Sequence, residues 1–256
     1  MWIYFLLFAV LLFVLYTAPL MRPRKPVLPV LLIGKTGTAP AADKHKRDWL
    51  CEKKLEKLFS ALQRKGFTSV LPADILSGKL PAKPVCLVFT GGYQSFTRLV
   101  FPLLEKYNLR TGTVLHAGLT GQYDSWQKPD EGPWQSLLTA ADIKHLQAGG
   151  RVEFISSTVD GLPLAQEDDT RACWQLTENK TRMEHLHKLH VRAVYFPQTN
   201  PRRPAVLRQA RQDFALLIGN ENGNNLLPTD FTVALHVFRI HQGTSFTRLL
   251  WKMTRQ

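Results

Sequence analysis

Charged side chains are absent from the first 21 residues of this 256-residue chain, and cysteine is scarce throughout it. The three cysteines, Cys51, Cys86 and Cys173, are odd in number and widely spaced, so they predict neither a disulfide framework nor a zinc motif. Cys86 lies in the apolar run 85–89, and we expect a buried free thiol there. Nothing marks any of the three as an activated nucleophile, which argues against a catalytic Cys–His pair.

Motifs for nucleic acid and for nucleotide phosphates are also lacking. No basic run is interleaved with aromatic residues, so we expect no nucleic-acid partner. Gly34-Lys-Thr suggests a phosphate-binding loop, but the glycine required five residues earlier is Pro29. There is no internal repeat and no low-complexity tract. A hydrophobic content of 45% predicts a packed core in one large or two small domains.

The uncharged segment 1–21 is predicted to be a single-pass membrane anchor. From Trp2 to Ala18 it is nearly all apolar, and about 17 to 21 such residues are near the minimum for a helix across a bilayer. Aromatic residues near its ends suit the two membrane interfaces. A cleaved signal peptide is the alternative reading. It is disfavoured because no Lys or Arg precedes the run and the stretch 17–20 is a poor cleavage site.

The whole net charge of +13 lies beyond this segment. We expect a basic, Pro-rich stalk at 22–29 and one folded domain over 30–256. Basic residues flank only the carboxyl side of the anchor, which by the positive-inside rule favours a cytoplasmic domain. Basic runs at 22–25, 44–47, 53–57 and 202–211 indicate an anionic membrane surface as partner, or else ordinary solvated helix faces.

Hydrophobic periodicity predicts strands that alternate with helices, the pattern of parallel βαβ units. The expected strands are 30–33, 67–71, 84–89, 113–117, 152–156, 193–196, 215–218 and 233–240. The expected helices begin at Asp48 and otherwise cover 73–76, 95–108, 134–148, 171–190 and 205–214. About seven such units predict an α/β fold, a distorted or incomplete (β/α) barrel.

One strand end carries a recognisable motif. Leu87-Val-Phe-Thr-Gly-Gly-Tyr-Gln-Ser-Phe96 resembles the signature of the polysaccharide deacetylase family, where a hydrophobic strand runs into Thr-Phe-Asp-Asp-Gly-Tyr and a helix. The resemblance extends over about 29–245 and is nearest to the branch that de-N-acetylates exported poly-glucosamine. It includes Phe101-Pro-Leu-Leu-Glu-Lys-Tyr-Asn, Trp134-Gln-Ser-Leu and Ala148-Gly-Gly-Arg-Val-Glu-Phe-Ile-Ser-Ser-Thr-Val-Asp-Gly161. It implies the deacetylase barrel.

The departures from the family pattern fall where the resemblance implies chemistry. Thr90 stands at the position of the catalytic base and Gly91 at that of the metal-binding Asp; Ser157 and Gly161 stand for the two metal-binding His residues. Ile33-Gly34 stands where the family has an early Tyr-His pair, and Phe196-Pro-Gln-Thr199 stands where it has a Tyr-Pro-Tyr-Gly loop. Leu235-His236 has the same two residue types as a Leu-His pair late in the family pattern. Deacetylation needs a metal-activated water and a base, and glycine has no ligand atom.

Other residues offer little for a new site. His185, His187 and His190 lack the i, i+4 spacing of a helical zinc motif, so a solvated helix end is the better reading. Asp160 and Glu153 could act as acids but are expected to be structural. We therefore expect no catalytic residue, metal or cofactor.

The sequence thus predicts a membrane-anchored, inactive deacetylase homologue. It would bind a glycan, or a partner protein of polysaccharide assembly, through a cleft lined by Thr90, Gly91, Tyr93, Ser157 and Asp160. Two alternatives stay open. One is a diverged carbohydrate-active hydrolase that cleaves C–N bonds with relocated catalytic groups. The other is a scaffold whose basic faces bind a membrane surface.

Overall fold

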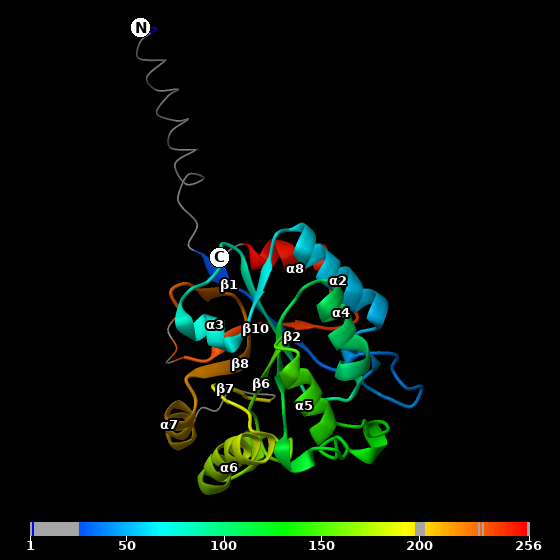
Figure 1. Cartoon of the computed structure of the whole chain (residues 1–256), viewed down its shortest axis with the longest axis vertical. Coiled ribbons are helices and arrows are strands. Elements are labelled where there is room, and N and C mark those ends of the chain that lie inside the picture. Colours follow the sequence, from blue (N-terminus) through cyan, green and yellow to red (C-terminus); the bar gives the residue numbers. More distant parts are fainter. Residues whose placement is uncertain (1, 3–25, 198–202, 230, 232, 255–256) are drawn as a thin grey trace.

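A computed structural model describes the chain except for residues 1, 3–25, 198–202, 230, 232 and 255–256 (Figure 1). The predicted anchor at 1–21, apart from Trp2, therefore lies outside the described residues, as do residues 22–25 of the predicted stalk. Among the residues that are described, no helix is long and apolar enough to cross a membrane.

The core is a nearly closed parallel barrel surrounded by helices (Figure 1). Its strands run in the order β6-β5-β4-β2-β10-β8-β7, and β3 pairs with the first half of β4. They are β2 Val30–Ile33, β3 Thr68–Val70, β4 Pro84–Phe89, β5 Thr111–Val114, β6 Val152–Ile155, β7 Ala193–Tyr195, β8 Leu216–Asn222 and β10 Leu235–Ile240. Ser156 closes the ring, because it bridges to Val194 of β7. The predicted (β/α) barrel is confirmed.

Alternation along each strand separates two apolar cores. In β2, Val30 and Leu32 face the barrel interior, whereas Leu31 and Ile33 face the surrounding helices. Cys86 of β4 belongs to the interior and is a buried free thiol, as expected from the sequence. Burial raises the pKa of this thiol to about 12, so it stays protonated and unreactive.

The helices pack on the outside of the barrel and bury one face each. In α2, Leu55, Leu58, Phe59 and Leu62 recur at helical spacing and are all fully buried. The helices are α2 Glu52–Arg64, α3 Pro72–Ser77, α4 Phe101–Lys106, α5 Ala140–Ala148, α6 Asp169–His187, α7 Pro204–Asp213 and α8 Phe246–Met253. A π-helical turn, Phe96–Val100, leads into α4.

Three helix boundaries differ from the prediction by three residues or more. The helix expected at 134–148 begins only at Ala140, because Thr139 and Asp142 form a capping box, with Thr139 Oγ1 accepting from the Asp142 amide at 3.1 Å. The helix expected to reach residue 190 ends at His187, since Lys188 takes a left-handed φ of 55°. The helix expected from Asp48 begins at Glu52, after a short 3₁₀ turn at Lys46–Asp48.

The folded unit begins before residue 30. Strand β1, Val27–Leu28, pairs antiparallel with β9, Asn225–Leu226, and Leu28 is fully buried. The Asn225 side chain also donates to the Leu28 carbonyl at 2.9 Å. The last residues of the predicted stalk are therefore part of the domain, because they bury apolar surface and satisfy their backbone groups there.

Asn179 ties α6 to the ends of two barrel strands. Its side chain accepts from the Ala117 amide at 2.7 Å and donates at 2.9 Å to both the Leu115 carbonyl and Ser156 Oγ.

Replacing Asn179 leaves several buried polar groups without partners, so we expect Asn179→Ala to lower the free energy of unfolding by about 2 to 4 kcal/mol. Chemical denaturation measures this. The exposed Thr181→Ala in the same helix should change stability by no more than about 0.5 kcal/mol; equal losses would contradict the assignment.

Candidate functional site

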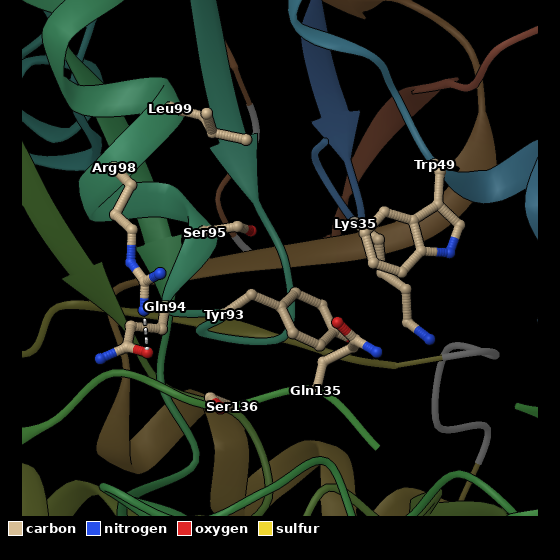
Figure 2. A pocket seen from close by; sticks show the side chains of 9 residues that line it. All are labelled: Lys35, Trp49, Tyr93, Gln94, Ser95, Arg98, Leu99, Gln135 and Ser136. Atoms are coloured by element: carbon tan, nitrogen blue, oxygen red, sulfur yellow. Dashed lines mark hydrogen bonds between the residues drawn. The ribbon is translucent and has the colours of Figure 1, made fainter. Parts of the chain in front are cut away.

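Two adjoining pockets lie at the carboxyl ends of the barrel strands, the end where barrel folds of this kind carry their functional groups. Both are lined by Lys35, which follows β2, and Tyr93, which follows β4. The Trp49 pocket has a volume of about 340 Å³ and also contains Gln94, Ser95, Arg98, Leu99, Gln135 and Ser136 (Figure 2). The Arg239 pocket, of about 400 Å³, also contains Gly34, His45, Asp48, Thr90, Trp126, Gln127, Glu131 and His241.

The turn after β4 places the Tyr93 ring against the main chain. Gly91 and Gly92 have φ values of +86° and +64°, a left-handed backbone that favours glycine. A Cβ atom on Gly91 would lie 2.3 Å from Tyr93 Cε2, closer than atoms can approach. The Tyr93 ring therefore occupies the space that a side chain at position 91 would need, and it points towards Lys35 and Trp49 (Figure 2).

A second ring fills the corresponding space at Gly161. This glycine has a φ of +78°, and a Cβ atom on it would lie 2.1 Å from Trp126 Cε3. The Trp126 ring centroid is 6.3 Å from that of Tyr93 and 4.8 Å from that of His116. We call Tyr93, His116 and Trp126 the aromatic plug. Burial lowers the pKa of His116, which disfavours the charged ring, and the hydrogen bond that Nδ1 donates to the Thr158 carbonyl at 2.7 Å offsets only part of that effect.

These residues do not fit a metal ion. Gly91 and Gly161 supply no donor atom, and the plug takes the room that donor side chains would occupy. Ser157, the third position at which the family resemblance implies a metal ligand, is fully buried, and its hydroxyl has no hydrogen-bond partner. Across the part of the chain that the structure describes, no three His, Cys, Asp or Glu residues are grouped as a metal site would require. That holds for the histidines of α6 as well, where His187 Nε2 lies 3.3 Å from Thr120 Oγ1.

The structure brings together only some of the residues predicted to line the cleft. Thr90 and Tyr93 border the Arg239 pocket, and Gly91 lies beneath the Tyr93 ring. Ser157 lines neither of the two pockets. Asp160 accepts hydrogen bonds from Gln175 Nε2 at 2.7 Å and from the Leu162 amide at 3.1 Å, so its carboxylate is engaged by its own loop and by α6.

Sequence reasoning missed a buried ion cluster behind the pockets. Lys35 Nζ lies 3.5 Å from Asp43 Oδ2 and 3.6 Å from Asp124 Oδ2, and it donates to Gln127 Oε1. Both carboxylates are fully buried. Lys35 also lies 5.5 Å from the centroid of Trp49 and 5.9 Å from that of Tyr93, within reach of cation–π attraction. The one signal available was the position of Lys35 directly after Gly34, at the end of a strand.

The pKa values of the two carboxylates in this cluster shift in opposite directions. Burial raises the pKa of Asp124, and the Gln135 amide and the Lys35 charge offset only part of that effect. Burial acts on Asp43 in the same sense, but hydrogen bonds from the Trp49 indole at 2.9 Å and the His45 amide at 2.7 Å, with Lys35, outweigh it and lower its pKa. Burial and the charge of Asp124 raise the pKa of Tyr93 far above its usual value, which keeps the hydroxyl protonated.

Comparison with known proteins identifies the architecture. No family model matches the sequence, and no curated protein sequence matches it. The Streptococcus pyogenes deacetylase PplD, solved with acetate, superposes with a TM-score of 0.76 over 90% of this chain and 99% of that one, at 18% identity. The chain has the polysaccharide deacetylase fold.

Further deacetylase structures agree with this assignment. A de-N-acetylase from Aggregatibacter actinomycetemcomitans superposes with a TM-score of 0.72 over 88% of this chain and 98% of that one, at 16% identity. IcaB from Ammonifex degensii gives a TM-score of 0.69 over 90% and 98%, at 17% identity. The resemblance predicted from the sequence is confirmed at the level of the fold. Identities this low carry no residue roles across.

A double-mutant cycle tests the packing of Tyr93 on Gly91. We expect Gly91→Ala to cost about 2 to 4 kcal/mol of unfolding free energy, because a Cβ meets both a left-handed backbone and the ring. In a Tyr93→Ala background the cost should fall by about 1 kcal/mol or more. Gly121 has a φ of +72° and open space around it, so Gly121→Ala should cost the same in both backgrounds. Additive effects at Gly91 would contradict the packing.

The buried cluster predicts a pH dependence of stability. Because the pKa of Asp43 is lowered on folding, its charge stabilises the protein fully above the ordinary carboxyl value of about 3.9. This contribution is lost as the pH falls through the lower, folded value. Asp43→Asn should therefore be less stable than the parent at neutral pH, with a difference that shrinks below about pH 4. Denaturant unfolding across pH measures it. Asp130→Asn, at an exposed ion pair, should show little difference at any pH.

Proposed function

We propose that this chain is a polysaccharide deacetylase homologue that binds a glycan without deacetylating it. The observation that carries the proposal is the aromatic plug, whose Tyr93 and Trp126 rings fill the side-chain space at Gly91 and Gly161. Under the family resemblance, these are two of the three metal-ligand positions. The glycines and the plug exclude a metal together, because a ligand side chain at position 91 or 161 would fit only if the ring beside it moved away.

The base that the reaction needs has no replacement at the pocket wall. Thr90 stands at its position and donates a hydrogen bond to the Ile33 carbonyl at 3.4 Å. A threonine hydroxyl does not accept a proton near neutral pH. Without a base, and without a metal to activate water, hydrolysis of an N-acetyl group has neither of the groups that lower its barrier.

The two pockets suit a sugar chain. Their walls combine aromatic surface from Trp49, Tyr93 and Trp126 with amide, hydroxyl and charged groups, the mixture that holds a ligand with apolar faces and many hydroxyls. Because both pockets share Lys35 and Tyr93, they adjoin, which supports an extended ligand rather than a single small molecule. Arg239, which donates to Asn220 at the far wall, adds a fixed cation. A partner protein of polysaccharide assembly is the other ligand that this role allows.

One observation favours the alternative of a hydrolase that cleaves C–N bonds with relocated groups. Asp124 is a buried carboxyl with a raised pKa beside the pockets, and perturbed groups of this kind often mark active sites. Its side chain, however, has no exposed surface, and the Gln135 amide and Lys35 hold its oxygens. A base must reach its substrate. We therefore favour binding, and we propose that the predicted segment 1–21 anchors the domain to a membrane.

Binding and turnover of soluble N-acetylglucosamine oligomers test the proposal. We expect calorimetry to detect binding, and no acetate release with or without added Zn²⁺ or Ni²⁺. Trp126→Ala should weaken binding about tenfold or more, since a lost aromatic contact of roughly 1.4 kcal/mol has that effect.

Two further variants support this test. Arg239→Gln is a milder probe of the same pocket, and Trp174→Ala, at an exposed tryptophan on α6, should leave binding unchanged. Metal-dependent acetate release would refute the proposal that the protein does not deacetylate its ligand. Folded protein that binds no oligomer would refute glycan binding of this class and favour a protein partner.

A further inference from the structure

A second surface lies on the outer side of the barrel, away from the two pockets. It is a groove of about 770 Å³ between α2 and α8, which we call the α2–α8 groove. Phe67 and Lys83 line it, and each directly precedes a barrel strand, β3 and β4. The groove therefore runs along the outer side of the barrel and reaches the amino ends of the strands, whereas the pockets lie at the carboxyl ends. Figure 1 shows α2 and α8 side by side on the outside of the barrel.

The groove combines an apolar floor with a cationic rim. Phe246, Leu250 and Trp251 of α8 supply apolar surface, and the Trp251 side chain is 53% exposed. The rim carries four cations and no carboxylate: Lys57, Arg64, Lys65 and Lys83. Among the described residues, none of these four forms an ion pair. Such a surface is complementary to a ligand that is both anionic and apolar.

The groove lies beside the point where the chain enters the domain. Asn224 Nδ2 donates to the Lys252 carbonyl of α8 at 2.7 Å. Asn224 directly precedes β9, which pairs with β1, so the carboxyl end of α8 is held close to the Leu28 end of β1. The residues before this strand include the uncharged segment 1–21 and the basic residues Arg22, Arg24 and Lys25. The groove thus lies close to β1, and the sequence directly before β1 has the composition of a membrane anchor and its basic flank.

We propose that the α2–α8 groove rests on an anionic bilayer surface. Trp251 lies at the level of the headgroups, where tryptophan is favoured, and the four rim cations contact lipid phosphates. Each Lys or Arg near such a surface strengthens partitioning by about fivefold. The contact turns the amino end of the barrel to the membrane. It does not depend on what the pockets bind.

Fluorescence quenching by brominated lipids tests the contact in the full chain. The protein is reconstituted into vesicles of phosphatidylcholine alone, or of phosphatidylcholine mixed with phosphatidylglycerol, in which the acyl chains carry bromine. The chain has six tryptophans, so the signal of Trp251 is the difference in quenching between the parent and Trp251→Phe. We expect this difference in the anionic vesicles and a loss of most of it in neutral ones.

Two charge-reversal pairs locate the contact. Lys57→Glu with Arg64→Glu, both on exposed positions of α2, should reduce the Trp251 signal about tenfold or more in anionic vesicles. Lys144→Glu with Arg208→Glu changes the net charge equally on α5 and α7 and should leave the signal intact. Circular dichroism establishes that both pairs are folded.

Three results would overturn the proposal. They are equal quenching in neutral vesicles, equal loss in both charge-reversal pairs, or no Trp251 signal in any vesicle. The last result would mean that another part of the chain, or another protein, covers the groove.

Discussion

Close packing of two aromatic rings on two glycines organises the carboxyl end of this barrel. Tyr93 lies on Gly91 and Trp126 lies on Gly161, and in each pair a single Cβ atom would overlap the ring. Both glycines have a left-handed backbone, so the turn geometry and the ring positions depend on the same residues. The pockets take their shape from these rings. A metal site built on these two positions would thus require changes in the glycines and in the rings at once.

The ion cluster around Lys35 is the second constraint on the pockets. It joins two segments distant in sequence, because Lys35 and Asp43 lie in the loop after β2 and Asp124 lies beyond β5. A buried charge is costly without a partner, so each member requires the others. The cluster therefore fixes the loops that carry Trp49 and Trp126 relative to the barrel.

Sequence periodicity predicted the strands and most of the helices, because these depend on residues close together in the chain. The apolar run Pro84–Phe89 was assigned as a buried parallel strand with its observed bounds, and each strand of the barrel was located to within a few residues. Helix α8 was missed, although Phe246, Leu249, Leu250 and Met253 recur at the i, i+3, i+4, i+7 spacing of an amphipathic helix. The plug and the ion cluster were also missed, and they have no such pattern. Trp126, Lys35 and Asp124 lie in loops, and only the folded chain brings them together, so no spacing along the sequence indicates that they meet.

The polarity of the barrel has a consequence for the kind of sugar this protein could reach. Parallel strands give the molecule two unlike ends, with β1 and the carboxyl end of α8 at one and the pockets at the other. Strand β4 has six residues, which at about 3.3 Å per residue separates the ends by up to about 20 Å. With the amino end on a bilayer, the pockets open away from the lipid. They would then meet a polymer that already extends from the surface, and a sugar still attached to its lipid carrier would lie out of range.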